Sequence, residues 1–270
     1  MGVDKKLERL HAILRGMQRV AIAFSGGVDS VFLARAAVDV LGTENVGVFT
    51  AVSASYPARE REESERLASS FGVKQYFFET RETDSPLFAK NPVDRCYHCK
   101  LELYRKLTII AETKGFANIL DGSNIDDISD YRPGLKALEE LKIRSPLKEA
   151  GLTKEEIRLL SKKLGLPTWN KQAFACLSSR FQYGDSITPE KLKKVEIAEE
   201  YLRDAGFAHF RVRDHGNLVR IETGEKEIDL FFDKPFRKRL VEKLKSLGYN
   251  FISLDLEGYR TGSMNEALKQ

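Results

Sequence analysis

The chain has 270 residues, a length that allows one large domain or two smaller ones. Its 42% hydrophobic and 31% charged residues are typical of a globular protein and exclude disordered, collagenous and low-complexity classes. The net charge is only +4, so charge alone gives no argument for nucleic-acid binding, and a small anionic substrate fits equally well.

The first fifteen residues predict a polar helix and not a targeting segment. Leu7, Leu10 and Leu14 recur at helical spacing, and the run lacks the continuous apolar stretch of a signal peptide. No segment approaches the roughly 20 apolar residues of a membrane span. We therefore expect a cytoplasmic protein without membrane contact.

Strands and helices alternate over the first half of the chain. Short β-branched and aromatic runs are each followed by a segment with apolar residues at helical spacing. The predicted strands are 19–24, 45–52, 73–78 and 116–121, and the predicted helices are 31–41, 57–71 and 96–114. This alternation predicts an α/β fold with a parallel sheet and helices on both faces.

The remainder has a different pattern. Thr153 and Glu156 predict the capping box of a helix ending near Gly165, and the aperiodic residues 169–184 suggest a loop over a site. Thr188 then opens a second series of elements. The predicted order is helix 190–205, strands 209–213 and 217–222, helix 235–247 and strand 250–255. We therefore expect an α/β domain at 1–184 and a small α+β domain at 185–270, which serves substrate binding or oligomerisation.

The most specific motif is the run Ser25-Gly26-Gly27-Val28-Asp29-Ser30, between the first predicted strand and helix. Two glycines allow a tight turn that directs successive N–H groups into one concavity, and the following helix adds its positive N-terminal end. The run therefore predicts an anion cradle, although it lacks the lysine of GxxxxGK[ST]. Ser25 and Ser30 offer hydroxyls, and Asp29 is placed to hold Mg²⁺ against a pyrophosphate. The alternative is a glycine-rich turn without a ligand.

This run resembles the SGGxDS loop of PP-loop (N-type) ATP pyrophosphatases, which binds the phosphates of ATP during cleavage to AMP and pyrophosphate. The resemblance covers residues 18 to about 180 and implies adenylation of a carbonyl or carboxyl oxygen. Asp29 and Ser30 would then be catalytic. The implied ATP site consists of Ser25, Gly26, Gly27, Asp29, Ser30, Asp121, Asn124 and Asp127. The last three follow the fourth predicted strand, where parallel sheets bind ligands, although such a DGSN run is also an ordinary turn.

The three cysteines form a second constellation. Cys96 and Cys99 make a CxxC at the start of a predicted helix, next to Arg95, and Cys176 stands alone. Three thiolates can hold a [4Fe-4S] cluster by three irons and leave the fourth iron open to an external sulfide. A structural zinc site, which needs a fourth ligand, and unrelated buried thiols are the alternatives. His98 lies between the paired cysteines and is a poor fourth ligand.

Further runs resemble the LarE family over nearly the whole chain. They are Tyr131 to Ala137, Arg144 to Leu147, Trp169 to Lys171, Cys176 to Gly184, Phe210 to Arg213 and Arg220 to Glu222. The resemblance implies ATP-dependent conversion of pyridinium-3,5-biscarboxylic acid mononucleotide to its bisthiocarboxylic acid form, for the nickel-pincer cofactor of lactate racemase. Two sulfur sources occur in the family: a sacrificial cysteine that ends as dehydroalanine, and a [4Fe-4S] cluster with an extra sulfide. The CxxC favours the cluster, reloaded by a sulfide donor, with Cys176 at the catalytic position.

Two arginines suit the mononucleotide phosphate. Arg211 and Arg213 alternate along a predicted strand and so share one face, where two guanidinium forks fit one phosphate. Arg180 belongs to the same expected site, and a solvated basic strand is the alternative. By the resemblance, Glu199, Glu222 and Asp229 are candidate secondary metal or intersubunit residues in a homo-oligomer.

Other functions remain open from the sequence. A tRNA thiolase also joins a PP-loop to three cysteines, but usually adds zinc-knuckle cysteines or an RNA-binding domain. A nucleotide-sensing protein with a C-terminal binding module is a non-enzymatic alternative. Glutamine-dependent relatives such as GMP synthetase are disfavoured because no amidotransferase domain is attached. Because the chain has neither the extra zinc-knuckle cysteines nor the added RNA-binding domain of a tRNA thiolase, we expect no nucleic-acid partner.

Overall fold

The computed structural model describes residues 2–128, 133–172, 176–260 and 263–264. The chain divides into two compact units. The first comprises Met1–Glu82 and Asp94–Phe174, and the second comprises Thr83–Val93 and Ala175–Gln270. The division falls about ten residues before the expected boundary near Asp185, and an earlier segment of the chain joins the second unit. Hydrogen bonds hold this earlier segment in the second unit, because Ala89 O accepts from Ile187 N at 2.8 Å and Asn91 O accepts from Gly184 N at 2.9 Å.

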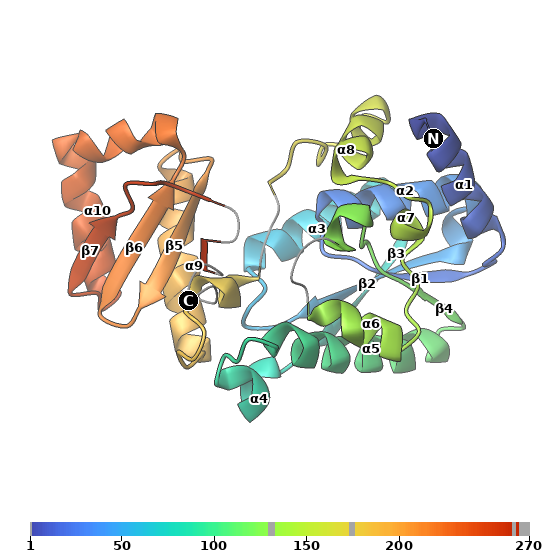
Figure 1. The fold of residues 1–270 in the computed structure, drawn as a ribbon, viewed down its shortest axis with the longest axis horizontal. Helices are drawn as coiled ribbons and strands as arrows, with labels where there is room; N and C mark the ends of the chain where they lie inside the picture. Colours follow the sequence, from blue (N-terminus) through green and yellow to red (C-terminus); the bar gives the residue numbers. More distant parts are fainter. Residues whose placement is uncertain (1, 129–132, 173–175, 261–262, 265–270) are drawn as a thin grey trace. The chain divides into compact units, whose positions relative to one another are not determined.

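The first unit is built on a parallel sheet in the order β3-β2-β1-β4 (Figure 1). Its strands are β1 (Val20–Ala23), β2 (Val46–Val52), β3 (Lys74–Glu79) and β4 (Asn118–Leu120). All three strand pairs run parallel. The predicted α/β fold is therefore confirmed, and the carboxyl ends of the neighbouring strands β1 and β4 lie side by side at one edge of the sheet.

Helices cover both faces of this sheet (Figure 1). Val20 and Ile22 of β1 pack into one apolar cluster with α1, α2 and α8, while Ala21 between them packs into a second cluster with α5. This alternation follows from the two-residue period of a strand. The helices of this unit are α1 (Val3–Arg15), α2 (Val28–Leu41), α3 (Ala58–Ser70), α5 (Arg95–Thr113), α6 (Gly134–Glu140), α7 (Pro146–Glu149) and α8 (Lys154–Lys163).

Local signals located most of these elements. The capping box of α8 is present, with Thr153 Oγ1 accepting from Glu156 N at 3.2 Å and Glu156 Oε2 accepting from Thr153 N at 2.9 Å. The short helices α6 and α7 were not predicted, because four to seven residues are too few to show a helical period. Helix α2 begins at Val28, three residues earlier than the apolar spacing indicated.

The second unit contains a mixed sheet in the order β5-β6-β7. Strands β5 (Phe210–His215) and β6 (Leu218–Thr223) are antiparallel, and β7 (Phe251–Leu254) runs parallel to β6. Its helices are α4 (Pro86–Ala89), α9 (Pro189–Asp204) and α10 (Lys234–Ser246). Thr188 caps α9 by accepting from Lys191 N at 3.3 Å, as the Thr-Pro signal predicted.

The expectation that residues 169–184 form a loop more than an element of the core is wrong for residues 177–181. Leu177–Arg180 form a 3₁₀ turn, and Leu177, Arg180 and Phe181 are almost completely buried. Phe181 also bridges to Asp214 of β5. A single short turn is too short to show a repeating pattern of apolar residues, so the sequence could not predict that this turn lies in the core.

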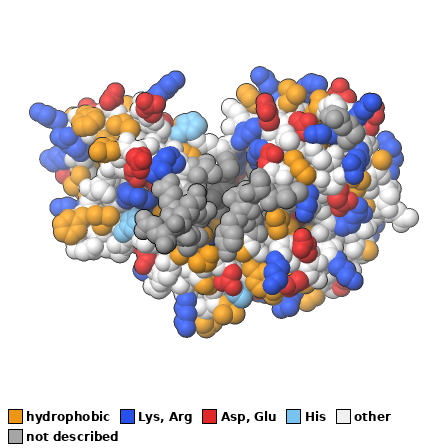
Figure 2. Space-filling model, viewed as in Figure 1, with side chains coloured by type: hydrophobic (Ala, Val, Ile, Leu, Met, Phe, Trp, Pro, Cys, Tyr) orange, Lys and Arg blue, Asp and Glu red, His pale blue; other side chains and the backbone are white. Residues whose placement is uncertain are grey.

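Within the described parts of the chain, no helix has the length and apolar character needed to cross a membrane. Figure 2 shows positive and negative side chains interspersed on the visible face of both units. Where the side chains of this face are coloured, they form no broad patch of one sign.

Candidate active site

The loop from Ser25 to Ser30 joins β1 to α2 at the carboxyl edge of the sheet. Gly26 has φ +72°, and a Cβ at this position would lie 3.3 Å from Ser64 Cβ, so both conformation and space favour glycine. Gly27 is the N-cap of α2 and makes no side-chain capping bond. The first N–H groups of α2 are therefore not capped by a side chain, as an anion site at a helix N-terminus requires.

The two serines of this loop are close together. Ser25 Oγ lies 3.3 Å from Ser30 Oγ and accepts from Gly27 N at 3.3 Å. Ser30 Oγ lies 3.1 Å from Gly27 O and is positioned to donate to it, while Ser25 is exposed. Ser25 therefore offers the accessible hydroxyl, and Ser30 mainly supports the first turn of α2.

Asp29 forms an ion pair that the sequence did not reveal. Its Oδ2 pairs with Lys154 Nζ, and its Oδ1 lies 3.4 Å from Asn124 Nδ2. Lys154 is the first residue of α8, and its backbone N–H donates to Asp126 Oδ2 at 2.8 Å. Since Lys154 is 125 positions from Asp29, only the fold could place this second charged group at the loop.

The loop after β4 packs against the first turn of α2. A Cβ on Gly122 would lie 3.2 Å from Ser30 N, so glycine permits this close approach. Asp121 accepts from Ser123 Oγ at 2.7 Å and from Ser145 Oγ at 2.5 Å. The approach of Gly122 places the expected DGSN residues beside the loop from Ser25 to Ser30, which is called the phosphate loop below for its proposed role.

The three polar residues expected in this loop are all buried, with exposed fractions of 4% to 6%. Asp127 Oδ2 accepts from Asn124 N at 3.0 Å, and Asn124 Oδ1 accepts from Asp126 N at 3.0 Å. Such short-range bonds shape a turn. Asn124 also directs its side chain toward Asp29, with Nδ2 at 3.4 Å from Asp29 Oδ1.

The CxxC lies in the first turn and a half of α5. Cys96 is exposed and Cys99 is half-buried. The buried Arg95 directs Nη2 to Cys96 Sγ at 3.8 Å, which places a positive charge beside the sulfur. His98 Nε2 lies 3.2 Å from Asp94 Oδ2, so its ring is oriented by a carboxylate. Cys176 lies in the second unit, where it is exposed and precedes the 3₁₀ turn.

A buried ion pair organises the second unit. Arg180 Nε and Nη2 donate to the two oxygens of Glu199 at 2.9 Å each, and both side chains are at most 5% exposed. Glu199 Oε1 also accepts from Val212 N at 3.1 Å. Although burial alone would raise it, the charge and hydrogen bonds of Arg180 hold the pKa of Glu199 below its ordinary value.

Arg211 and Arg213 share one face of β5 but are not solvated. Arg213 Nη2 donates to Glu222 Oε2 at 2.6 Å, and its Nη1 donates to Ser179 O at 2.9 Å. Burial and the nearby Arg180 lower the pKa of the Arg211 guanidinium. The alternative of a solvated basic strand is therefore wrong, since both arginines are at most 9% exposed.

The three acidic residues singled out by the resemblance have different surroundings. Glu199 is paired with Arg180, and the fully buried Glu222 accepts from Arg213, Arg220 and Ser263. Asp229 is exposed. Among the residues that the structure describes, no group of three or more His, Cys, Asp or Glu is placed to hold a metal ion.

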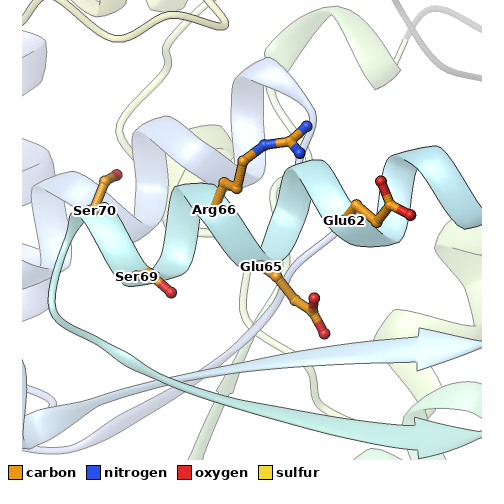
Figure 3. Close-up of a pocket in the computed structure, with 5 residues that line it drawn as sticks. All are labelled: Glu62, Glu65, Arg66, Ser69 and Ser70. Carbon is orange, nitrogen blue, oxygen red and sulfur yellow. The ribbon is translucent and has the colours of Figure 1, made fainter.

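An open hollow lies along α3 (Figure 3). Its side chains do not converge, because Arg66 points to one side of the helix while Glu65 and Ser69 point to the other. None of the expected site residues lines it. The lining residues are Glu62, Glu65, Arg66, Ser69 and Ser70.

The comparison with known proteins identifies the family. No family model matches the chain. An uncharacterized protein of Synechocystis sp. is 43% identical over 266 residues, which is 98% of this chain and 99% of that protein. The pyridinium-3,5-bisthiocarboxylic acid mononucleotide synthase of Lactiplantibacillus plantarum is 40% identical over 263 residues, which is 97% of this chain and 95% of the synthase. The chain belongs to the family of this synthase, the LarE family.

A distant relative supports the assignment of the first unit. One of the component chains of the glutamine-hydrolyzing GMP synthase of Pyrococcus furiosus is 22% identical over 279 residues, which is 94% of this chain and 86% of that component. A relation of this kind is expected for a PP-loop protein. The LarE resemblance drawn from the motifs is thus confirmed, as is the expectation that the protein is an enzyme.

The Asp29–Lys154 pair generates a first prediction. In Asp29→Asn, the pairing carboxylate is replaced by a neutral amide of similar size. We expect formation of AMP from ATP to fall about tenfold to a hundredfold, the worth of one charge-assisted contact. The circular dichroism spectrum should be unchanged, since Asp29 is a partly exposed residue of a first helical turn. If the variant formed AMP at the wild-type rate, Asp29 would have no role in the reaction of ATP.

The Arg180–Glu199 pair generates a second prediction. Glu199→Gln leaves the Arg180 charge buried without its counter-ion, which should lower the free energy of unfolding of the second unit by about 3–5 kcal/mol at pH 7. The lowered pKa of Glu199 means that its contribution is present above the ordinary value of 4.5 and is lost as the pH falls through the folded-state pKa.

Hydrogen exchange of the Val212 amide measures this effect within the second unit. The difference between wild type and variant should be large at pH 7 and should shrink below about pH 4.5. Glu200→Gln, one position further along α9, is the matched control and should change little. Equal protection of Val212 in wild type and Glu199→Gln at pH 7 would contradict the prediction.

Proposed function

We propose that this protein is an ATP-dependent sulfur transferase that converts pyridinium-3,5-biscarboxylic acid mononucleotide to its bisthiocarboxylic acid form. The 40% identity to the named synthase over 97% of the chain carries this proposal. The phosphate loop at the carboxyl edge of the first sheet supports it, because a carboxylate must be activated before sulfur can replace its oxygen. The product belongs to the nickel-pincer cofactor.

ATP would bind with its phosphates against the loop from Ser25 to Ser30. A substrate carboxylate oxygen attacks the α-phosphorus, the acyl adenylate forms, and pyrophosphate leaves. The loop N–H groups and the N-terminal end of α2 oppose the negative charge of the departing phosphates, which is the main electrostatic contribution of the protein. Lys154 adds a positive charge at the same loop through its contact with Asp29.

Asp29 fits a Mg²⁺ shared with nucleotide phosphates. Mg²⁺ at such sites takes one or two carboxylates and completes its shell with phosphate oxygens and water. The Asp29 side chain is 23% exposed in the first turn of α2, whereas the carboxylate of Asp121 accepts from Ser123 and Ser145 and that of Asp127 accepts from Asn124 N. When bound, the ion supplies charge neutralisation at the phosphates. Lys154 would then be released from Asp29 and become available to a phosphate oxygen.

Arg180, Arg211 and Arg213 are the proposed ligands of the mononucleotide phosphate. Two of them share Ser179, because Arg213 donates to Ser179 O and Arg180 donates to Ser179 Oγ. The charges of Arg180 and Arg213 are close enough to Arg211 to help lower its pKa. Arg213 Nε is buried and has no hydrogen-bond partner among the described residues. An unsatisfied buried donor on a cation is costly, and an anion would satisfy it.

Cys96, Cys99 and Cys176 are the proposed ligands of a [4Fe-4S] cluster. Cys96 and Cys99 are three positions apart on α5 and so lie on the same side of the helix, with Arg95 beside the first sulfur. A bound cluster with three protein ligands supplies an open iron that can carry sulfide from a donor. The role of the chain is to keep these thiols accessible, and Cys96 and Cys176 are both exposed.

A sacrificial Cys176 is the second candidate for the sulfur source. Its exposure would let the thiolate attack the acyl adenylate, expel AMP and form a thioester. Cleavage of the Cβ–Sγ bond by elimination of the α-proton would leave the sulfur on the substrate and dehydroalanine at position 176. Cys96 and Cys99 have no part in this chemistry, which is why the CxxC argues for the cluster.

A thiolation assay tests the proposed function and separates the two sulfur sources. Protein purified without oxygen is incubated with the mononucleotide, ATP, Mg²⁺ and sulfide. The masses of the pyridinium product and of the protein are then measured by mass spectrometry. We expect oxygen-to-sulfur exchange in the product, with iron and intact Cys176 in the protein. Cys96→Ala, Cys99→Ala and Cys176→Ala should each lose iron and thiolation while retaining ATP binding.

Dehydroalanine at position 176 in an iron-free, active preparation would show that the sulfur comes from Cys176 and not from a cluster. Thiolation of tRNA without thiolation of the mononucleotide would overturn the proposed substrate.

A further inference from the structure

Two side chains hold the carbonyl side of the phosphate loop, and neither the motifs nor the resemblance gave them a role. Tyr56 Oη lies 3.2 Å from Ser25 O, and Lys171 Nζ lies 3.3 Å from Gly26 O. All four residues belong to the first compact unit. Because the two carbonyls are consecutive, the contacts fall on neighbouring peptide groups of the loop.

The same two side chains are anchored on α3. Tyr56 Oη lies 3.1 Å from Glu60 O, and Lys171 Nζ lies 2.8 Å from Glu60 Oε2. Since a tyrosine has one hydroxyl proton, the two carbonyls near Tyr56 share it. Helix α3 also packs behind the loop, because a Cβ on Gly26 would lie 3.3 Å from Ser64 Cβ. The loop is therefore supported from one helix by packing and by hydrogen bonds.

These contacts fix the direction of two backbone N–H groups. In a trans peptide the C=O and N–H groups point in opposite directions. The carbonyl of Ser25 shares its peptide with Gly26 N–H, and the carbonyl of Gly26 shares its peptide with Gly27 N–H. Gly27 N donates to Ser25 Oγ at 3.3 Å, and Ser25 is exposed, so this N–H points to the accessible side of the loop. A donor on each carbonyl also polarises the peptide and strengthens its N–H as a donor.

The charges around Lys171 suit a supporting role more than direct phosphate binding. Its single positive charge faces the carboxylates of Glu60 and Glu63, with Glu63 Oε2 at 2.9 Å, so the cluster is net negative. Arg158 Nη2 donates to Lys171 O at 2.8 Å and holds the backbone of this residue in the first unit. Burial raises the pKa of Tyr56, which keeps its hydroxyl protonated and able to donate.

We propose that Tyr56 and Lys171 are positioning residues for the phosphate loop. They hold the carbonyls of Ser25 and Gly26 so that the attached N–H groups face the phosphates of ATP before the nucleotide arrives. This inference rests on the proposed function for the identity of the nucleotide. N–H groups that are already oriented need no reorganisation when negative charge is placed on them. Both residues act through the loop and not as ligands of the phosphates.

The first part of the test needs no nucleotide. A hydrogen bond at a carbonyl polarises its peptide, so the ¹⁵N chemical shift of the attached amide reports that bond. Tyr56→Phe should therefore move the amide signal of Gly26, and Lys171→Met should move that of Gly27. Signals from the far end of α2 should stay in place, which reports an intact fold.

The second part measures the dissociation constant of ATP with Mg²⁺ by calorimetry. We expect Tyr56→Phe to weaken binding about threefold to tenfold, the worth of one neutral hydrogen bond, and Lys171→Met to weaken it about tenfold or more. Tyr56→Phe leaves every charge in place, so its effect cannot come from charge repulsion. Lys171→Arg keeps the charge and a donor and should restore most of the affinity. A residue that only stabilised the fold would lower the melting temperature and leave the affinity of the folded protein unchanged.

Matched variants control for the substitutions themselves. Tyr97→Phe removes a tyrosine hydroxyl that donates to Glu140 Oε2 at 2.8 Å elsewhere in the first unit. Lys163→Met removes a lysine that is 57% exposed on α8. Both variants should bind ATP as the wild type does. Tyr56→Phe removes a single oxygen atom, and it decides the test if circular dichroism shows that Lys171→Met fails to fold.

The proposal is overturned for either residue if its variant binds ATP with wild-type affinity or leaves the signal of its glycine in place. Absence of ATP binding by the wild type would overturn the proposed function and this inference with it. The pyridinium substrate is not needed in either measurement. A protein whose ATP affinity depends on both residues, but which forms no thiolated product, would support this inference and contradict the proposed function.

Discussion

The left-handed turn at Gly26 is the constraint on which the active site depends. With φ +72° and Ser64 directly behind it, this residue lets β1 end and α2 begin within a few positions. Asp29 and Ser30 consequently lie in the first turn of α2, beside the loop that follows β4. A larger residue at Gly26 would have to displace α3 or change the backbone, and either change would move the groups of the proposed phosphate site.

The second unit, which we propose to bind the substrate phosphate, differs in its charges from the proposed ATP site of the first unit. It pairs two buried guanidinium groups with carboxylates, Arg180 with Glu199 and Arg213 with Glu222, and it also buries Arg211. Removing charges from water is expensive, and such pairs are stable only when hydrogen bonds satisfy the remaining atoms. In the first unit, the proposed ATP site consists mainly of backbone N–H groups and one partly exposed ion pair. This contrast fits the proposal that one unit binds a transient nucleotide and the other binds a precisely oriented substrate phosphate.

Much of the fold could be predicted because its signals are local. The four parallel strands, the capping box at Thr153 and the Thr-Pro start of α9 depend on neighbours within a few residues. The sequence did not show that residues 83–93 join the second unit, because this depends on carbonyls of Ala89 and Asn91 that accept hydrogen bonds from residues almost a hundred positions later. The core position of Arg180 was hidden for a related reason, since a single 3₁₀ turn carries no period.

The candidate site shows the same limit. The phosphate loop itself was recognisable because its residues are consecutive, but Lys154 and Lys171 reach it from 125 and 145 positions away. One sequence gives no sign of such pairings. The arginines of β5 were located by alternation, yet alternation could not show that both are buried or that Arg213 pairs with Glu222.

The central claim is that ATP activates a substrate carboxylate by adenylation. An oxygen-isotope experiment tests this most directly. The mononucleotide is prepared with ¹⁸O in its carboxylates and incubated with the protein, ATP, Mg²⁺ and sulfide, and the AMP is analysed by mass spectrometry. Adenylation predicts one ¹⁸O in AMP for each oxygen replaced by sulfur, because the bridging oxygen leaves with the phosphate. Thiolated product accompanied by unlabelled AMP, or by ADP with the label in phosphate, would contradict the account.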